Sequence, residues 1–578
     1  MNNGIDLLHA QGPGARSHVT IRRDGGAHTV RAGTQLGALL PRDIGGEPVI
    51  AGLVDHRPAA LVTPIWSDAR VDPITTGHWE GARIYRRSVG LLLLDAAARV
   101  RPDLSLRLEH SLGYAHSVRV HGNHGSLQAL ASVLNQAMCG LVDADLPLVE
   151  QWWSVEEARG HLLRQGWNDA AALLETRRHA AVATVSYGEV FAPRFGPLAP
   201  RTGMLSDFCL IPDHDALLLV HGVIDPSPQV GRCPGPPDPA EQQRAAAAAQ
   251  MQSTSLADHR RWLDALGTTS VAELNRACIR GGVSQLIRVS EGYQEKRIGQ
   301  IADVIAARRD EIAIVCIAGP SSSGKSTFIE RLRVQLQVDG VQPKGLSLDD
   351  YYADRHSIPR GEDGEHDFEA LEALQLGLLQ AHVRSLIEGK TVRLAAYDFH
   401  TGASKPAGGP ELALGRSDVL LVEGIHGLNP ELLTGVSHDR IFRIFVSPLA
   451  QLPFDSLTRL HASDLRLLRR IVRDRHGRST EAAATIARWP SVRDGERRHI
   501  FPYQAHADAV FDSSLIYEPC VLRVFAERYL LEVPPEHPSY ATAFRLLELL
   551  DQFVTIYPDH VPPTSILREF IGRTGFEF

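Results

Sequence analysis

One short stretch constrains the fold of this 578-residue chain more than any other: "GPSSSGKS", residues 319–326. It fits the spacing G-x-x-x-x-G-K-[ST]. The apolar run "EIAIVCIA" ends at Ala318 directly before it, and an amphipathic pattern, "STFIERLRVQL", follows directly after. Glycines let backbone N–H groups turn toward phosphate oxygens, and the N-terminus of a helix adds its positive dipole. The context predicts a phosphate-binding loop between a buried strand and a helix, and disfavours a chance Gly/Ser loop.

The residues of this loop have separate expected roles. Lys325 should contact the β and γ phosphates of a nucleoside triphosphate, and Ser326 should ligate Mg²⁺. No G-x-G-x-x-G follows the strand, so a dinucleotide cofactor is not expected. The residues predicted to bind ATP are Gly319, Pro320, Ser321, Ser322, Ser323, Gly324, Lys325, Ser326 and Thr327.

The C-terminal half of the chain alternates β-rich runs with amphipathic patterns. The runs are "EIAIVCIAG", "VQPKGLSLDD", "SDVLLVEG" and "RIFRIFVS". Continuous apolar runs of this length are typical of parallel strands that are buried on both faces. They predict a doubly wound α/β domain over residues 311–578, with helices toward its C-terminal end.

Two acidic residues follow predicted strands, at the sheet edge where ligands bind in this architecture. Asp349, in "LSLDDYY", can accept the proton of an attacking hydroxyl, whereas its neighbour Asp350 should face elsewhere. Glu423, in "VLLVEG", can hold Mg²⁺. The alternative for both is an ordinary solvated acid at a strand end. For His426, the two interpretations are a catalytic residue and a packed loop histidine.

Four arginines lie along one face of a predicted helix in "SDLRLLRRIVRDRHGRS": Arg466, Arg469, Arg470 and Arg473. A cationic stripe of this kind repels itself unless an anion lies opposite, which suits a lid over a transferring phosphoryl group. The alternatives are a solvated basic face and, more weakly, a nucleic-acid surface, since no aromatic residues are interspersed.

The N-terminal half has a different pattern. Residues 18–40 predict a strand, a turn at Asp24-Gly25-Gly26, a second strand and a helix, which together indicate a small α+β module. A Pro-rich linker begins at Asp225. The capping box "SVAE" at Ser270 predicts the start of a helix that continues to about Arg309.

Composition limits the class of protein. The net charge is -8, which gives no general attraction to nucleic acid or anionic membranes. Six cysteines are scattered without a C-x-x-C pair, which favours reduced thiols over a disulfide framework. No secretory leader pattern and no bilayer-length apolar run is found. We therefore expect a soluble cytoplasmic protein without membrane contact; a homo-oligomer is left open.

The C-terminal motifs together resemble the uridine kinase and phosphoribulokinase family. The resemblance implies a P-loop kinase that uses ATP and Mg²⁺, with Asp349 as base and Glu423 at the metal. The lid pattern D-x-R-x-x-R-R-x-x-R-D matches from Asp464 to Asp474.

The segment that helps to hold the nucleoside in uridine kinases, Y-D-x-x-x-H-x-R, corresponds here to "YDFHTGAS". Tyr397 and Asp398 match, His400 is out of register, and Gly402 and Ser404 replace the histidine and arginine. With Tyr352, the residues expected to bind the acceptor are Tyr397, Asp398 and His400. The departure leaves the base of the nucleoside open.

The first part of the chain resembles threonyl-tRNA synthetases. Residues 1–82 resemble a TGS-type β-grasp domain, and residues 83–224 resemble the α+β second additional domain that edits mischarged tRNA. The stretches "HSLGYAH" and "GPLAPRTG" support this. His110 and His116 are six residues apart rather than four, and Arg194 and Leu198 replace the cysteine and histidine of the editing motif. The resemblance therefore implies a non-editing domain, between which and the kinase lies a linker and helical connector, 225–310.

These patterns favour a kinase that phosphorylates the 5′-hydroxyl of a nucleoside, uridine- or cytidine-like or another. One alternative is a regulatory P-loop ATPase whose N-terminal half contacts RNA or tRNA. The other is a kinase for a non-nucleoside acceptor, such as a sugar phosphate or pantothenate.

Overall fold

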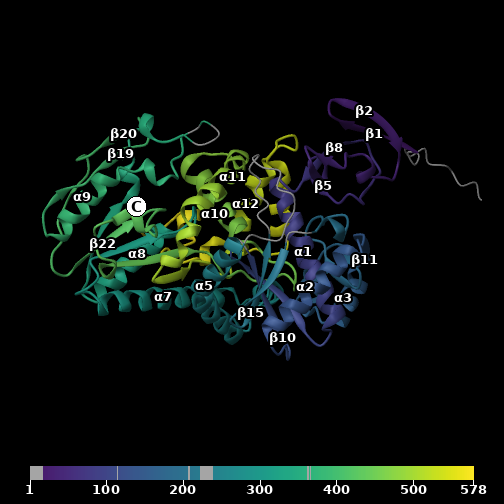
Figure 1. Cartoon of the computed structure of the whole chain (residues 1–578), viewed down its shortest axis with the longest axis horizontal. Coiled ribbons are helices and arrows are strands. Elements are labelled where there is room, and N and C mark those ends of the chain that lie inside the picture. The colour runs from purple at the N-terminus through teal and green to yellow at the C-terminus, as the bar shows by residue number, and fades with distance from the viewer. Residues whose placement is uncertain are drawn as a thin grey trace, which may run out of the picture.

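The protein is described by a computed structural model. Its described residues are 17–112, 115–205, 208–221, 239–360, 364 and 366–577. The predicted Pro-rich linker from Asp225 lies outside them up to residue 238. Figure 1 shows a small N-terminal module beside a second domain at one end of the molecule, and the larger C-terminal domain at the other. No helix in the described part of the chain is long and apolar enough to cross a membrane.

The N-terminal module is built on a hairpin and a parallel strand pair. Its main strands are β1 (His18–Arg23), β2 (Gly26–Arg31), β5 (Glu47–Val54) and β8 (Ala69–Thr75). Strand β1 pairs antiparallel with β2 and parallel with β8. Asp24 and Gly25 have positive φ, as a tight hairpin turn requires. The helix predicted after the second strand is wrong: a single 3-10 turn at Leu36–Ala38 stands there, since Gly37 and Pro41 leave no helix-forming run.

The second domain packs one long helix and a shorter one on antiparallel sheets. Its helices are α1 (Trp79–Val100), α2 (Leu127–Asp143), α3 (Val155–Arg164) and α4 (Asn168–Leu173). One sheet has the order β14-β15-β10-β9, and the other β11-β12-β13. Their strands are β9 (Ser105–Ser111), β10 (Ala115–His121), β11 (Val149–Ser154), β12 (Ala181–Tyr187), β13 (Val190–Pro193), β14 (Phe208–Asp213) and β15 (Ala216–His221).

Three helices connect this domain to the kinase-like one: α5 (Pro239–Leu266), α6 (Val271–Ile279) and α7 (Val283–Ala307). The predicted capping box is confirmed, because the Ser270 hydroxyl accepts from the backbone N–H of Glu273. The helix does not continue unbroken to Arg309. It is interrupted at Gly281, whose φ of 82° favours glycine and ends α6.

The C-terminal domain is a five-stranded parallel sheet in the order β17-β22-β16-β23-β24. The strands are β16 (Ile314–Ala318), β17 (Gln342–Ser347), β22 (Asp418–Glu423), β23 (Ile441–Ser447) and β24 (Ala509–Asp512). Along β16, Val315 and Ile317 join the core under α7 and α8 (Lys325–Val338), whereas Ile314 and Cys316 join the core under α9 (Leu376–Ile387). The sheet is therefore covered on both faces, which confirms the doubly wound prediction.

Further helices complete this domain on the side of the second domain (Figure 1). They are α10 (Ala462–Arg478), α11 (Ala482–His499), α12 (Glu518–Leu531), α13 (Tyr540–Leu550) and the short α14 (Arg568–Ile571). Two small hairpins lie between β17 and β22: β18 (Val392–Arg393) with β21 (Glu411–Leu412), and β19 (Ala396–Asp398) with β20 (Ala403–Lys405).

A buried carboxylate joins the two halves. Asp464, at the start of α10, accepts from both terminal nitrogens of Arg83 on α1, at 2.7 and 2.8 Å, and of Arg545 on α13, at 2.9 and 3.1 Å. It is fully buried, and the two guanidinium groups hold its pKa far below the usual range against the effect of burial. Glu80 on α1 also pairs with Arg545 at 2.8 Å.

Asp464→Asn should destabilise the whole molecule, because it leaves two buried cations without their carboxylate. Breaking a buried ion pair on one side costs about 3–5 kcal/mol. We expect a clear fall in the urea midpoint, followed by tryptophan fluorescence. Asp103→Asn, which removes an exposed pair with Arg101, is the matched control and should leave the urea midpoint nearly unchanged. Equal midpoints for the two variants would contradict the assigned role of Asp464.

Candidate active site

The phosphate-binding loop has little room for side chains at its glycines. A Cβ on Gly319 would overlap the carbonyl oxygen of Val446 on β23. Gly324 has φ of 88° and is the N-cap of α8, a conformation that side chains disfavour. The loop therefore passes close to the sheet and delivers the first turn of α8 without a side-chain cap from Gly324.

Polar groups of the loop lack partners on its inner side. The hydroxyl oxygens of Ser322 and Ser323 are buried and have no hydrogen-bond partner among the described residues. The Lys325 ammonium is folded back onto the carbonyls of Gly319, at 2.7 Å, and Pro320, at 3.3 Å. Buried donors without partners are costly, so this arrangement suits an anion that accepts from the loop.

Two predicted carboxylates lie beside Lys325. Asp349 follows β17 and Glu423 ends β22, the strands that pair at Ser347 and Glu423. Desolvation raises the pKa of each carboxyl, and the Lys325 charge opposes this. Asp350 faces away, as expected, and accepts from the backbone of Tyr397. Asp349 and Glu423 therefore lie at the carboxyl ends of two neighbouring strands of the sheet.

The oxygen groups at this edge fit Mg²⁺. Neither carboxylate makes a hydrogen bond or ion pair with another described residue, although both are partly desolvated. The described residues contain no cluster of three or more metal-ligating side chains. Magnesium bound through one or two carboxylates and substrate phosphates needs no such cluster. Ser326 and Glu423 are the side chains that would hold it.

Aromatic residues form the wall on the acceptor side. The rings of Tyr352 and Tyr397 lie 5.5 Å apart, and Phe399 packs edge-on against Tyr397 at 4.9 Å. The Tyr397 hydroxyl is buried without a partner among the described residues, whereas that of Tyr352 donates to the Phe368 carbonyl. Phe399, which the sequence analysis did not single out, is 57% exposed and offers a ring face.

Two residues predicted to bind the acceptor have other positions. The Asp398 carboxylate accepts from the backbone N–H groups of His400, at 2.9 Å, and Thr401, at 3.3 Å, so it stabilises the β19–β20 turn. His400 is exposed on that turn. Neither side chain is brought to the sheet edge with Asp349, which leaves Tyr352 and Tyr397 as the acceptor-side residues of the predicted set.

Two of the four arginines of the predicted lid, all of which are on α10, lie behind the loop rather than on a free face. Arg466 forms an ion pair with Glu496 at 2.5 Å and donates to the Ser321 carbonyl. Arg469 pairs with Glu518 and donates to the Ser322 carbonyl at 3.3 Å. Both are fully buried. These two guanidinium groups support the loop through its carbonyls. They are therefore not free to face a transferring phosphoryl group, as the predicted lid would require.

The other two arginines remain at the open side. Arg470 donates to the Ser321 hydroxyl at 3.0 Å, and Arg473 pairs with Asp474 at 2.9 Å. Both are partly exposed. They are the arginines of the predicted lid whose charge can face a transferring phosphoryl group.

Three glutamates near the loop were missed by sequence reasoning. Glu496 on α11 accepts from the backbone N–H of Ser321 at 3.1 Å. Glu569 on α14 accepts from both the N–H and the hydroxyl of Thr327, each at 3.1 Å, at the N-terminus of α8. Burial raises the pKa of Glu369 to about 7, with Glu496 adding to the shift. No local pattern marks them, since each comes from a distant segment.

In the second domain, the positions that correspond to the editing motif hold paired or buried side chains. Arg194 pairs with Glu150 at 3.1 Å, and Leu198 is fully buried. His110 and His116 are buried, and burial lowers the pKa of both imidazoles. Among the described residues, these side chains belong to no group of three or more potential metal ligands.

Comparison with known proteins supports the kinase-like interpretation of the C-terminal part. Residues 314–516 match the sequence model described as the Phosphoribulokinase / Uridine kinase family. A uridine kinase of Brevibacillus brevis is 27% identical over 198 residues, which are 34% of this chain and 83% of that protein. A uridine kinase of Chloroflexus aggregans is 28% identical over 199 residues, 34% of this chain and 85% of that protein. These matches confirm the resemblance of the C-terminal part to this kinase family.

The first part of the chain has its own relative. A threonine–tRNA ligase of Halorhodospira halophila is 27% identical over 162 residues, which are 28% of this chain. The match spans only 25% of the ligase. It agrees with the synthetase-like domains expected at the N-terminus.

Glu369→Gln should flatten the dependence of stability on pH. Burial raises the pKa of the Glu369 carboxyl from 4.5, the usual value for a glutamate, to about 7, so stability is lost as pH rises between these values. We expect the fall in Tm from pH 5 to pH 8 to be smaller in the variant. The exposed Glu372→Gln is the matched control. Unchanged pH dependence in Glu369→Gln would contradict the raised pKa.

Glu569→Gln should strengthen ATP binding. The carboxylate occupies backbone and hydroxyl donors at the N-terminus of α8 and brings negative charge toward the phosphates. Removing one such repulsion, worth about 1 kcal/mol, should lower the Kd by about fivefold. Calorimetry with ATP measures it, and the exposed Glu577→Gln serves as control. Weaker binding by Glu569→Gln would show that the carboxylate helps to hold the nucleotide instead.

Proposed function

We propose that this protein is an ATP- and Mg²⁺-dependent kinase that phosphorylates the 5′-hydroxyl of a nucleoside. The observation that carries the proposal is the meeting of Lys325, Asp349 and Glu423 at the carboxyl edge of the parallel sheet, beside a loop with unpartnered donors. The kinase family match over residues 314–516 supports the reaction class.

Phosphoryl transfer depends on alignment and on neutralisation of charge rather than on covalent chemistry by the protein. In the proposed reaction, Lys325 leaves the loop carbonyls and contacts the β and γ phosphates. Asp349 accepts the proton of the attacking hydroxyl, and Arg470 and Arg473 face the transferring group. Ser326 and Glu423 would hold Mg²⁺, which would add to the neutralisation of the phosphate charge.

The acceptor is proposed to lie against the aromatic wall. Phe399 presents an exposed ring on which a base can stack, and the unpartnered Tyr397 hydroxyl can bond to it. Two of the matched relatives are uridine kinases. Because Gly402 and Ser404 replace the histidine and arginine expected in the nucleoside-binding segment, a base other than uracil remains within the proposal.

An acceptor screen tests the proposal. Purified protein with ATP and Mg²⁺ is incubated with purine and pyrimidine nucleosides, ribulose 5-phosphate and pantothenate, and products are read by mass. We expect a nucleoside monophosphate with the wild type and none with Lys325→Ala. A bisphosphate product would indicate a sugar-phosphate kinase, and no product from any acceptor would contradict the proposal.

A variant of Asp349 tests its assignment as the general base. Asp349→Asn should lower turnover by about 10²–10⁴-fold, the usual contribution of a general base. Asp350→Asn, the adjacent residue that faces away, should lose far less. Circular dichroism checks that both variants are folded. Near wild-type turnover in Asp349→Asn would exclude a base role for this carboxylate.

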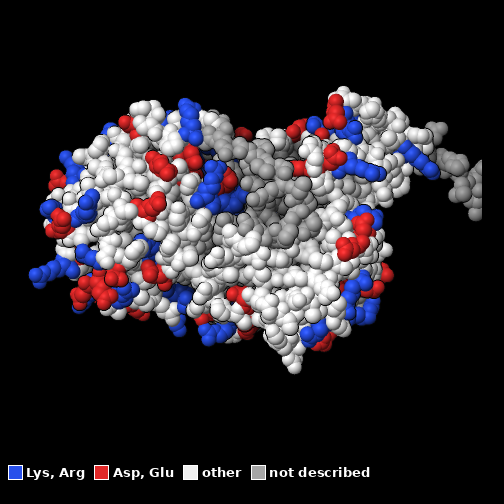
Figure 2. Space-filling view, viewed as in Figure 1, with Lys and Arg blue, Asp and Glu red and all other residues white. Residues whose placement is uncertain are grey.

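The ligase match favours one second candidate, a regulatory ATPase whose first part contacts tRNA. Charge gives it little support: Figure 2 shows acidic and basic residues interspersed over the viewed face rather than one basic surface. Tight tRNA binding that weakens steeply with salt, together with RNA-stimulated ATP hydrolysis, would favour this candidate over the kinase.

A further inference from the structure

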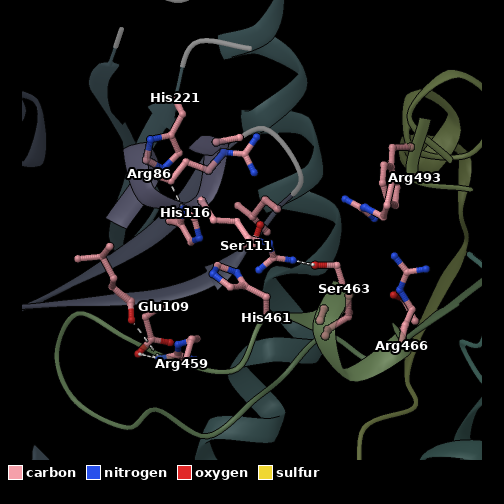
Figure 3. Close-up of a pocket in the computed structure, with 18 of the residues that line it drawn as sticks. Arg86, Glu109, Ser111, His116, His221, Arg459, His461, Ser463, Arg466 and Arg493 are labelled. Atoms are coloured by element: carbon pink, nitrogen blue, oxygen red, sulfur yellow. Dashed lines mark hydrogen bonds and ion pairs between the residues drawn. The ribbon is translucent and has the colours of Figure 1, made fainter. Parts of the chain in front are cut away.

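A cavity of about 150 Å³ lies between the synthetase-like and kinase-like halves, away from the acceptor wall. We call it the interdomain cavity. From the first half it is lined by residues of α1, β9, β10 and β15, including Arg86, Glu109 and His221. The segment after β23, α10 and α11 supply the opposite wall, including Arg459 and Arg493. Figure 3 shows side chains of both halves directed around this common space.

The lining is strongly cationic. Seven arginines and one acidic residue, Glu109, line the cavity among the described residues. Some of the arginines are neutralised by carboxylates: Arg83 by Asp464, and both Arg466 and Arg493 by Glu496. Glu109 lies 3.7 Å from Arg459 and 3.4 Å from Arg119, so its charge is already shared. No carboxylate in the lining is left over for a further cation.

Among the described residues, Arg86 is a cation of the lining with no carboxylate that compensates its charge. It makes no hydrogen bond or ion pair with another described residue. Burial and the charges of Arg83, Arg497 and Arg493 lower its pKa to about 10, and it still carries its proton at neutral pH. A desolvated charge that faces only like charges is costly. An anion in the cavity would remove that cost.

Other polar groups around Arg86 also lack partners. His221 is 4% exposed, and its Nδ1 atom has no hydrogen-bond partner among the described residues. Its other nitrogen bonds to His116 at 2.9 Å. Arg459 is 8% exposed, and its Nε atom is likewise unpartnered. Burial lowers the pKa of His116 to about 3, so this imidazole is neutral and can donate one N–H without adding charge.

We infer that the interdomain cavity is a binding site for a small phosphate-bearing anion. Several guanidinium donors converge on one space, and planar arginine forks match phosphate oxygens. Size agrees: a cavity of about 150 Å³ accommodates benzene, with six heavy atoms, and a phosphate group has five. Two sources supply this chemistry: inorganic phosphate, and a phosphomonoester whose organic part extends through the opening.

The cavity is connected to the nucleotide site through one side chain. Arg466 lines the cavity and also donates to the Ser321 carbonyl of the phosphate-binding loop. Its partner Glu496 accepts from the Ser321 N–H. The proposed site is nevertheless separate from the loop, because Arg86 and His221 belong to the first half of the chain. Binding there can be measured whether or not the protein is a kinase.

The test measures phosphate binding by the full chain. Since the nucleotide loop can itself bind phosphate, all proteins carry Lys325→Ala, and binding is followed by equilibrium dialysis and by the rise of Tm with ligand. The ligands are inorganic phosphate and methyl phosphate, with chloride at equal ionic strength as control. We expect saturable binding of one or both phosphates and no comparable effect of chloride.

Variants of Arg86 locate the site. Arg86→Gln should weaken phosphate binding at least about tenfold, because a charge-assisted hydrogen bond is lost. Arg86→Lys, which keeps the charge, should retain most of the phosphate binding. The exposed Arg164→Gln should leave phosphate binding unchanged. Without ligand, Arg86→Gln should have an equal or higher Tm, which separates lost binding from misfolding.

The binding measurements either support or overturn the proposed phosphate site. Preference for methyl phosphate would identify a phosphomonoester as the ligand class, and preference for inorganic phosphate the free ion; either supports the site. Loss of all binding with Lys325→Ala alone, unchanged binding in Arg86→Gln, or an equal effect of chloride would each overturn it, leaving a cavity that holds water.

Discussion

The buried carboxylate of Asp464 is the constraint on which the arrangement of this molecule depends. It receives four N–H groups from two arginines, one on α1 of the first half and one on α13 of the second. Without Asp464, Arg83 would lose its ion-pair partner and Arg545 would keep only Glu80. Because the three charges are satisfied only when α1, α10 and α13 meet, they fix the orientation of the halves, and with it the walls of the interdomain cavity.

Helix α10, which carries Asp464 in its first turn, also supports the phosphate-binding loop. Three carbonyl groups of the loop accept hydrogen bonds from side chains: Ser321 from Arg466, Ser322 from Arg469 and Ser323 from Ser513. A peptide unit whose carbonyl is held on one side of a loop tends to present its N–H on the other. The loop is thereby kept open for an anion before any nucleotide arrives, and the arginines that hold it are themselves held by Glu496 and Glu518.

Local patterns were sufficient for the parts of the fold that depend on neighbouring residues. The parallel strands, the phosphate-binding loop, the Asp349 and Glu423 positions and the Ser270 capping box could all be predicted, since each follows from a contiguous run. The ion pairs of Arg466 and Arg469 could not be predicted, because their partners are 30 and 49 residues away. Glu569 lies 242 residues from Thr327. The missing N-terminal helix shows the other limit, where glycine and proline outweigh a weak helical pattern.

The hydrogen bond from the Leu108 amide to the Ser456 carbonyl lies at a place where the halves share their interior. Leu457 belongs to the hydrophobic core of the first half, and Phe195 stacks on Phe454 within the core of the second. Although the two parts resemble different protein families, neither has a complete surface of its own. A chain cut between them would yield two fragments with exposed apolar faces, so we expect the two parts to unfold together as one cooperative unit.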